Sequence, residues 1–291
     1  MAADPYLQEN GTFKNRLGLT DAAELQARET VISSVRLAQM KQLERPVGRF
    51  DLDHLREIHR RAFGDVYEWA GKTRGEWTTI QGERFMPPAG LMKGGTRFAD
   101  GPMVEPFLRD TFRQLERDNQ LRGLSRPEFA GKAAELMGDM NAAHPFREGN
   151  GRTQREFMRE LGVEAGHQLN FSVVSQARMI QVSIESARGD NEGLRRMLLE
   201  ISDRQAVRAL QQAEQALEKR GQDWNGLYVA TANKGQNYAG EVAWKGRELS
   251  AVQDGNRVIV APTRELGRGV QEGQSVQFTA SGRVQGFDLN Y

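Results

Sequence analysis

A stretch of twelve residues near the middle of the chain constrains its fold more than any other feature. Residues 144–155 read His-Pro-Phe-Arg-Glu-Gly-Asn-Gly-Arg-Thr-Gln-Arg. The stretch combines a candidate base, one carboxylate, a glycine-flanked amide turn and arginines, which is the set of groups needed to handle a nucleoside triphosphate. The chain must therefore hold these residues together as one ordered segment.

Helical patterns flank this segment on both sides. Ser125 and Glu128 form a capping box with a proline in the first turn, and apolar residues follow at helical spacing. The pattern predicts a core helix over residues 126–142 that delivers His144 just beyond its end. Gly149, Asn150 and Gly151 predict a turn with converging N–H groups. Residues 153–161 have a helical composition. A glycine turn before a helix start makes an anion hole for phosphate.

Each polar side chain of the segment suits one task. His144, with an ordinary pKa of about 6.5, can take a proton from an attacking hydroxyl near neutral pH. Glu148 is the only carboxylate in the loop and is the predicted Mg²⁺ ligand. Arginine forks bind phosphate oxygens in pairs. The predicted nucleotide-binding set is Phe146, Gly149, Asn150, Gly151, Arg152 and Arg155, in which Phe146 is mainly a core anchor.

The segment matches every fixed position of the Fic family signature, His-x-Phe-x-(Asp/Glu)-Gly-Asn-Gly-Arg-x-x-Arg. Residues 6–18, 54–74 and 165–171 resemble the Fic domains of Bartonella type IV secretion effectors and related conjugation-linked toxins. The resemblance implies a mainly α fold, with an all-helical Fic domain that carries a β-hairpin flap. It also implies transfer of AMP from Mg²⁺-bound ATP to a Thr, Tyr or Ser hydroxyl of a target protein.

The flap implied by the family is a hairpin that docks the target protein. Residues 78–88 predict two short strands around Gln81 and Gly82, ended by a proline pair. An exposed strand edge there can hold a target segment by main-chain hydrogen bonds, although an ordinary surface hairpin has the same pattern. Residues 93–98 are also flap-like, and the first candidate is preferred for its spacing from Arg74. The predicted docking residues are Thr79, Ile80, Gln81, Gly82, Glu83, Arg84 and Phe85.

The pattern changes from helix to strand near residue 221. Residues 203–220 predict a connecting helix ended by Gly221. Five strand candidates in the next seventy or so residues suggest a small all-β OB-like barrel, an order that also resembles the effectors. The predicted strands are 227–231, 240–244, 248–252, 257–261 and 275–279. The predicted domains are a Fic domain over 1–202, a connecting helix over 203–222 and an OB-like domain over 223–291.

The OB-like domain carries aromatic and basic residues, but they do not form a nucleic-acid pattern. Tyr228, Trp244 and Lys245 are candidates for stacking and phosphate contact. No basic patch interleaves with aromatics, so a scaffold or partner-docking module is favoured over a nucleic-acid site. A formal net charge of +1 likewise gives no global field that attracts nucleic acid or membrane.

Composition indicates a reducing compartment. The chain has no Cys, no apolar run of spanning length and no signal-peptide pattern at its start. These features predict a cytoplasmic protein of the producing bacterium, and the resemblance adds translocation into a host or recipient cell. Family members usually carry a further C-terminal transfer-signal domain. The chain stops at Tyr291 without one, which leaves open a shortened chain or a member lacking that domain.

Restraint of the activity is expected from another chain. The family is commonly inhibited by a helix with the pattern (Ser/Thr)-x-x-x-Glu-(Gly/Asn). Glu9 has Pro5 at the hydroxyl position, and Glu192 has Arg188 there. The resemblance therefore implies a small antitoxin that supplies an inhibitory Glu to Arg155.

Two alternatives to AMP transfer stay open. Fic relatives can move phosphate or phosphocholine, and the fold can also serve as a non-catalytic, nucleotide-binding adaptor. The intact His144, Glu148, Arg152 and Arg155 favour AMP transfer over both.

Overall fold

The computed structural model describes residues 4–42 and 49–281. The chain forms two compact units. Unit 1 comprises Met1–Leu124 and Glu135–Gly166, and unit 2 comprises Ser125–Ala134 and His167–Tyr291. The domain limits predicted at residues 202 and 222 stay a prediction.

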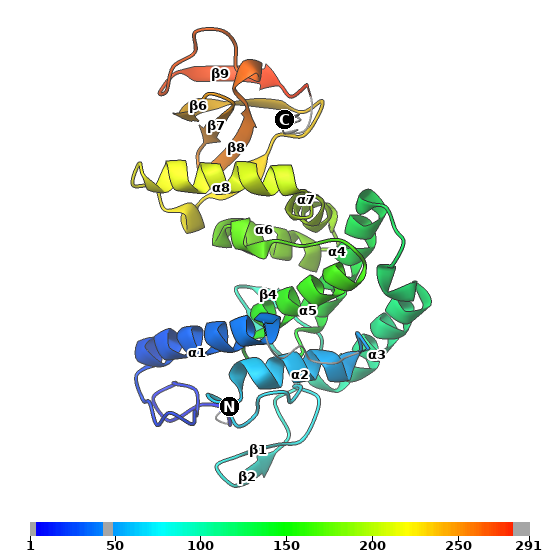
Figure 1. The fold of residues 1–291 in the computed structure, drawn as a ribbon. Coiled ribbons are helices and arrows are strands. Elements are labelled where there is room, and N and C mark those ends of the chain that lie inside the picture. The colour runs from blue at the N-terminus through cyan, green and yellow to red at the C-terminus, as the bar shows by residue number, and fades with distance from the viewer. Residues whose placement is uncertain (1–3, 43–48, 282–291) are drawn as a thin grey trace. The chain divides into compact units, whose positions relative to one another are not determined.

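Five helices supply the framework of unit 1 (Figure 1). The amphipathic helix α2 illustrates why they form: Asp51 caps it by accepting from the His54 backbone N–H at 2.9 Å, and its apolar face is buried. The predicted core helix is confirmed, and Glu128 accepts from the Ser125 backbone N–H at 2.9 Å as a capping box requires. The helices are α1 Ala22–Gln42, α2 Leu52–Phe63, α3 Gly101–Arg117, α4 Arg126–Ala143, which continues into unit 2 at its start, and α5 Asn150–Glu164, with a 3-10 turn at Asn119–Leu121.

Two short antiparallel hairpins belong to unit 1. The first pairs β1 (Thr78–Ile80) with β2 (Glu83–Phe85), and its turn residues Gln81 and Gly82 both have positive φ. The second pairs β3 (Met92–Lys93) with β4 (Thr96–Arg97) around two glycines of positive φ. Positive φ at both central residues is typical of the turn that matches strand twist, so the predicted hairpin at 78–85 is confirmed.

An aromatic cluster joins the N-terminal segment to the first hairpin. The Tyr6 ring meets the Trp69 ring at 5.4 Å and the Phe85 ring at 5.3 Å, both edge to face. Tyr67 stacks on Trp69 at 4.4 Å, and Ile80 of β1 is buried in the same cluster. These contacts fix the first hairpin through apolar packing.

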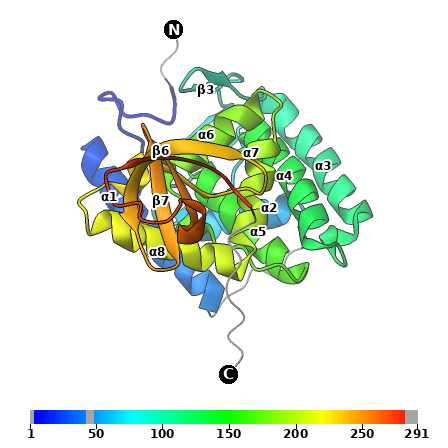
Figure 2. The same cartoon turned by 90° about the horizontal axis from the view of Figure 1, so that it is seen from above.

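Unit 2 combines helices with one sheet. Helix α8 contacts four of the strands and lies along the sheet (Figures 1 and 2). The strand order is β5-β8-β7-β6-β9, in which only the pair β5 and β8 is parallel. The elements are α6 Gln176–Ala187, α7 Glu192–Ile201, α8 Arg204–Glu218, β5 Tyr228–Thr231, β6 Asn237–Lys245, β7 Leu249–Asp254, β8 Arg257–Pro262 and β9 Ser275–Thr279, with 3-10 turns at Phe171–Val173, Trp224–Gly226 and Thr263–Glu265.

The predicted fold class is confirmed: a mainly α chain with a hairpin-bearing helical part is followed by a small all-β part. All five predicted strands exist, and the helix predicted over residues 203–220 is α8; its role as a connection between domains stays a prediction. The OB-like barrel stays a prediction, since what the structure gives is one five-stranded sheet.

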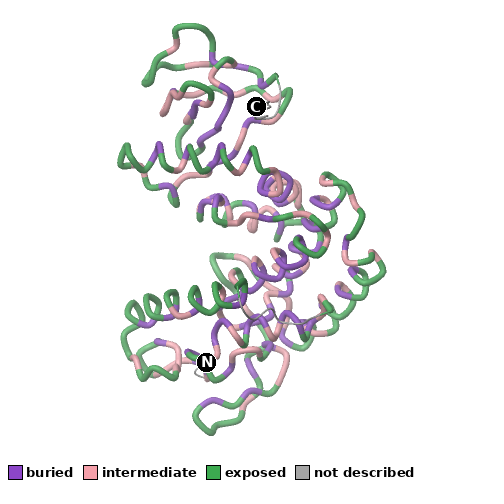
Figure 3. The backbone as a smooth tube through the Cα atoms, viewed as in Figure 1, coloured by how far each residue is buried: buried purple, intermediate pink, exposed green. Residues whose placement is uncertain are grey.

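Burial differs between the helices of unit 1. Helix α5 is mostly buried, whereas α1 is largely exposed (Figure 3).

Within residues 4–42 and 49–281, none of the helices combines the length and apolar character needed to cross a bilayer.

Candidate functional site

His144 follows the last turn of α4 in a strained backbone conformation. Its φ is +43°, in the left-handed region that side chains other than glycine rarely adopt. Its backbone N–H donates to the Met140 carbonyl at 3.0 Å, which ends the helix. The turn directs the histidine out of the helical path and into the loop that follows.

Arg74 holds this turn in place. The Arg74 side chain is buried, and its Nε donates to the His144 carbonyl at 2.8 Å. One Nη donates to the carbonyls of Ala143 at 3.0 Å and Ala99 at 2.8 Å. The carbonyls of His144 and Ala143 stand at the C-terminal end of α4, where helix carbonyls lack partners. Arg74 therefore caps α4 and ties the segment after β4 to the histidine.

The environment of His144 keeps its imidazole neutral. Burial, together with the nearby cations of Lys93 and Arg74, lowers the pKa of His144 to about 3. The Phe98 ring stacks on the imidazole with centroids 3.9 Å apart. At neutral pH the side chain has a free electron pair to accept a proton, as a general base requires.

Asn150 braces the loop. Its Oδ1 accepts from the Phe146 N–H at 2.9 Å, and its Nδ2 donates to the Phe146 carbonyl at 2.7 Å. Phe146 is fully buried and stacks on the His59 ring at 3.8 Å. The expectation that Phe146 anchors the loop in the core is confirmed, and the Asn150 side chain serves the same purpose.

Both the backbone conformation and the lack of space beside the Phe63 ring require a glycine at position 149. Its φ is +83°, and an added Cβ would lie 2.5 Å from the Phe63 ring. The Thr153 N–H donates to the Gly149 carbonyl at 3.1 Å, so Asn150 and Gly151 already belong to the first turn of α5. The helix predicted over 153–161 thus begins at residue 150. The first N–H groups of a helix have no partner within it, so this helix start is suited to the predicted anion hole, which stays a prediction.

Glu148 is held on both its backbone and its carboxylate. His59 Nε2 donates to the Glu148 carbonyl at 2.9 Å, and one carboxylate oxygen accepts from the Gly149 N–H at 3.1 Å. Lys93 Nζ lies 3.3 Å from the other oxygen. Despite burial, the Lys93 ammonium and the Gly149 hydrogen bond lower the pKa of Glu148. The carboxylate is therefore ionised and already positioned beside a cation.

The residues present fit a divalent cation shared with a nucleotide. No group of three or more metal-ligating side chains occurs in the part of the chain that the structure describes. A single ionised carboxylate is what Mg²⁺ needs when phosphates and water supply the other oxygens. Glu148 therefore fits Mg²⁺ carried by a triphosphate better than a protein-only metal centre.

The two predicted arginines have different surroundings. Arg152 forms an ion pair with the buried Glu29 of α1, donates to Ser33 Oγ at 2.8 Å and lies 4.7 Å from the Phe63 ring centroid. These contacts fix its guanidinium in place before any ligand binds. Its position is therefore governed by α1 as much as by its own helix.

Arg155 folds back over the start of α5, as its spacing predicts. A Cβ at Gly151 would lie 3.2 Å from Arg155 Nη1. Among residues 4–42 and 49–281, Arg155 has no carboxylate partner in hydrogen-bond or ion-pair range. Burial and the Arg152 charge lower its pKa, but an arginine stays charged near neutrality. Arg155 thus presents an uncompensated cation at the helix N-terminus.

The structure brings the second hairpin, rather than residues 79–85, to the motif. Lys93 of β3 meets Glu148, and Phe98 just after β4 meets His144. The first hairpin instead contacts Tyr6 through Phe85. Which hairpin docks a target stays a prediction.

Several residues at this site lie outside the set predicted from the sequence, among them Glu29, His59, Arg74, Lys93 and Phe98. Each acts through a long-range contact; Arg74 and His144, for example, are 70 residues apart. Two signals in the sequence point to them: the run of residues 58–74, which stands out by resemblance only, and the second flap-like candidate at residues 93–98.

Comparisons with known proteins agree with this geometry. The model of the Fic/DOC family matches residues 49–161. The protein adenylyltransferase VbhT of Bartonella schoenbuchensis is 40% identical over 190 residues, 65% of this chain. The type IV secretion system effector protein BepA superposes with a TM-score of 0.87 at 31% identity, covering 95% of this chain and 96% of its own. An N-terminal Fic domain from Bartonella quintana, solved with bound ADP, has a TM-score of 0.65 at 36% identity, covering 67% and 93%.

Two of the curated relatives are longer proteins. The matched region spans 37% of the length of VbhT and 44% of a protein adenylyltransferase from Bartonella henselae. The similarity therefore concerns the region that holds the motif and, for BepA, nearly the whole chain.

Proposed function

The chain belongs to the Fic/DOC family, and from that premise we propose that it is a protein adenylyltransferase. It would move AMP from Mg²⁺-bound ATP to a Thr, Tyr or Ser hydroxyl of a target protein. The observation that carries the proposal is that one loop holds a neutral, half-buried His144, an ionised Glu148 and, at the start of α5, an Arg155 without a carboxylate partner in the described residues. VbhT is named a protein adenylyltransferase, and the Bartonella quintana relative holds ADP.

The proton step follows from the state of His144. A neutral imidazole accepts the proton of the target hydroxyl as its oxygen attacks the α-phosphorus, and pyrophosphate leaves on the opposite side. Triphosphate charge next to the ring favours the protonated form, so the basicity of His144 rises when the nucleotide is bound. Arg74 and Phe98 hold the ring at the end of α4.

The phosphate chain would lie over the start of α5. The N–H groups of Asn150, Gly151 and Arg152, in the first turn of α5, would bind the α-phosphate, and the helix dipole there also favours negative charge. Arg152, fixed by Glu29, would neutralise the leaving pyrophosphate, and Arg155 would orient the γ-phosphate. Glu148 would hold Mg²⁺, which supplies charge neutralisation on the phosphates when bound.

We propose that the second hairpin, β3 and β4, docks the target protein. Phe98 and Lys93 place residues 91–98 beside His144 and Glu148, and the Met92 side chain is 68% exposed. The β3-β4 ladder is two residues long, so its outer edge offers main-chain groups to an extended target segment. Residues 79–85, which their spacing favours, are the weaker candidate in this proposal because they pack with Tyr6.

Control and location are proposed from the same features. An antitoxin carboxylate would pair with Arg155, whose charge is uncompensated in the described residues. BepA is a type IV secretion system effector, and translocation into another cell's cytosol would suit this chain too. The sheet of unit 2 would form an OB-like module that docks a partner or acts as a scaffold.

The test is labelling of protein targets. The chain and a His144→Ala variant are incubated with ATP labelled on the α-phosphate, in bacterial and in eukaryotic lysates. A labelled protein band that depends on His144 supports AMP transfer, and Arg268→Ala, an exposed change in unit 2, should leave the band unchanged. Label that enters only from γ-labelled ATP would indicate phosphate transfer and overturn the proposal.

A further inference from the structure

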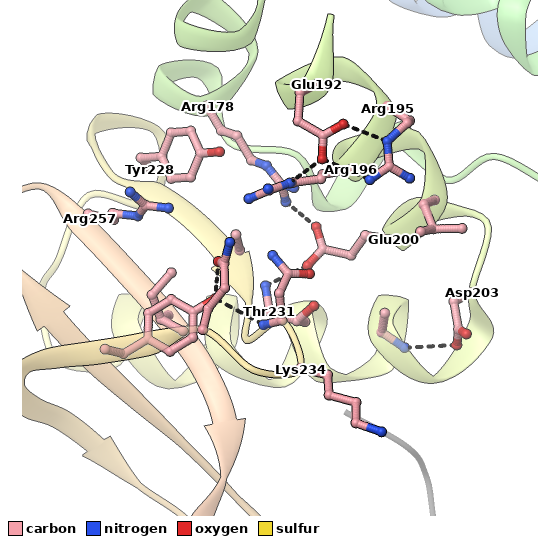
Figure 4. Close-up of a pocket in the computed structure, with 17 residues that line it drawn as sticks. Arg178, Glu192, Arg195, Arg196, Glu200, Asp203, Tyr228, Thr231, Lys234 and Arg257 are labelled. Carbon is pink, nitrogen blue, oxygen red and sulfur yellow. Dashed lines mark hydrogen bonds and ion pairs between the residues drawn. The ribbon is translucent and has the colours of Figure 1, made fainter. Parts of the chain in front are cut away.

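Unit 2 contains a cavity that the proposed function does not use. Its volume is about 250 Å³. The walls come from α6, α7, the first turn of α8, the strands β5 and β8, and residues 233–238. Figure 4 shows charged side chains from the helices and the strand β8 around this space, with Arg178, Glu200 and Arg257 directed toward it and Lys234 extending away from them. Every lining residue lies in unit 2, whereas the motif of residues 144–155 lies in unit 1.

The carboxylates of the cavity are already fully engaged. Glu192 accepts from both Arg195 and Arg196 at 2.6 Å. Glu200 pairs with Arg178 and accepts from the Thr231 N–H. The third carboxylate, Asp203, caps α8 by accepting from two backbone N–H groups. No lining carboxylate is left to balance a further cation.

The cations of the cavity outnumber these carboxylates. In the described part of the chain, neither Lys234 nor Arg257 pairs with a carboxylate. The Arg257 guanidinium lies 5.3 Å from the Tyr228 ring centroid, so its planar face is covered while its N–H edge remains available. Arg195 and Arg196 share the single charge of Glu192. The cationic lining side chains are Arg178, Arg195, Arg196, Lys234 and Arg257.

Arg178 adds a buried donor that lacks an acceptor. The residue is 2% exposed, and one Nη donates to Glu200 and to the Val229 carbonyl at 3.0 Å. Its Nε is buried and has no hydrogen-bond partner in the residues that the structure describes. Leaving a charged donor unpaired is unfavourable, so the protein neighbours of Arg178 satisfy its positive charge only in part.

We propose that this cavity binds a small phosphate-bearing molecule of about the size of a sugar phosphate. The uncompensated cations select an oxyanion, and arginine edges match phosphate oxygens. The volume suits a small ligand, since sites for drug-sized molecules usually begin near ~300 Å³. The apolar wall of Leu199, Ala230 and Ile259 leaves a surface for the carbon part of the ligand.

Titration calorimetry on the full chain tests this site. The probes are inorganic phosphate, ribose 5-phosphate and uncharged ribose at low salt. Both phosphates should bind and ribose should not, and ribose 5-phosphate should bind more tightly because it also covers the apolar wall. Arg257→Gln and Lys234→Gln should each weaken phosphate binding about tenfold, the loss expected for one charge-assisted contact. Circular dichroism confirms that each variant is folded.

Two matched variants distinguish binding in this cavity from binding at the motif and from attraction to surface charge. Arg268→Gln, exposed in unit 2 and outside the cavity, should leave binding unchanged. Arg155→Gln removes a cation of the motif only, so the part of phosphate binding that depends on Arg257 should persist in it. Phosphate binding that is lost in Arg155→Gln but kept in Arg257→Gln would overturn the proposal. So would the absence of any binding, or Arg257-dependent binding of a ten-residue thymidine oligonucleotide without binding of either small phosphate.

Discussion

His59 Nε2 donates a hydrogen bond to the Glu148 carbonyl over 2.9 Å, while His59 Nδ1 accepts one from the Gly71 N–H at 2.8 Å. The backbone donor at Gly71 fixes the tautomer, so the ring proton lies on Nε2 and faces the motif. Burial lowers the pKa of His59 to about 3, which keeps the ring neutral. His59 thus positions the loop without taking part in proton transfer.

Replacing His59 should disturb nucleotide binding while leaving the fold intact. His59→Ala removes the donor to Glu148 and the ring that stacks on Phe146, so nucleotide affinity should fall about tenfold or more. His59→Gln keeps an amide donor and should recover part of that loss. Calorimetry with ADP and Mg²⁺ measures both variants. Equal affinity in His59→Ala and the parent chain would contradict the positioning role.

Arg74 is predicted to be the strongest single contributor to the order of the His144 turn. Arg74→Ala removes the donor to the buried Ala143 carbonyl and to the part-buried carbonyls of His144 and Ala99, and should lower the free energy of unfolding by about 3 kcal/mol. Arg74→Lys should be nearly as damaging, because a single ammonium does not reproduce the planar fork. Urea unfolding measures both changes. The exposed variant Arg268→Ala is the control, and a loss below about 1 kcal/mol in Arg74→Ala would count against this role.

Alkaline stability should depend on Tyr6. Burial raises the pKa of Tyr6 to about 12, from about 10 in an unfolded chain. The folded state keeps the phenol proton that the unfolded state releases. The stabilising contribution is therefore full below pH 10 and is lost as the pH rises from about 10 to about 12. The expected slope is about 1.4 kcal/mol per pH unit.

The control for this pH effect is Tyr6→Phe, which has no phenol to ionise. Urea unfolding of both chains at pH 9 and pH 11 should show a smaller decline in the variant. Identical declines would mean that Tyr6 does not titrate differently in the folded and unfolded states.

Local signals make much of the fold predictable. The capping box at Ser125 and Glu128 predicts the start of α4, and the five strand patterns after residue 221 predict the sheet of unit 2. The predicted start of α5 is three residues late, because Asn150 and Gly151 look like turn residues. Only the left-handed Gly149, which serves as the N-cap, reveals that they are helical.

Long-range contacts make the rest of the site unpredictable. The motif itself contains His144, Glu148 and Arg155, but the residue that fixes Arg152 is Glu29, 123 positions earlier. A pairing of this kind leaves no periodic trace in the sequence. The sequence does not decide between the two hairpins for the same reason, since spacing along the chain does not reveal that Lys93 meets Glu148.

Gly149 should tolerate no side chain. Gly149→Ala puts a Cβ 2.5 Å from the Phe63 ring at a φ of +83°, so the loop or Phe63 must shift. We expect a loss of about 2 kcal/mol in the free energy of unfolding, from strain and overpacking together. Gly166→Ala is the matched control, because that glycine has a φ of +85° and nothing within 4 Å of an added Cβ. Equal losses in the two variants would show that backbone strain alone accounts for the effect.

Removing Lys93 should lower the Mg²⁺ concentration that nucleotide binding requires. The Lys93 ammonium lies 3.3 Å from the Glu148 carboxylate, and its side chain is 64% exposed, so the ion pair is weak and exchangeable. In Lys93→Ala the carboxylate is left without its cation, and Mg²⁺ no longer competes with an ammonium for it. Calorimetric titration of ADP should show half-saturating Mg²⁺ lowered severalfold, as a difference of about 1 kcal/mol implies.

Two comparisons isolate this effect from a general change in the hairpin. Arg97→Ala, on the paired strand β4 and also exposed, should leave the Mg²⁺ requirement unchanged. In EDTA, Lys93→Ala should bind ADP no more tightly than the parent chain, because the gain belongs to the cation. A higher Mg²⁺ requirement in Lys93→Ala would mean that Lys93 assists the phosphates more than it competes for Glu148, and the competition between ammonium and metal would be rejected.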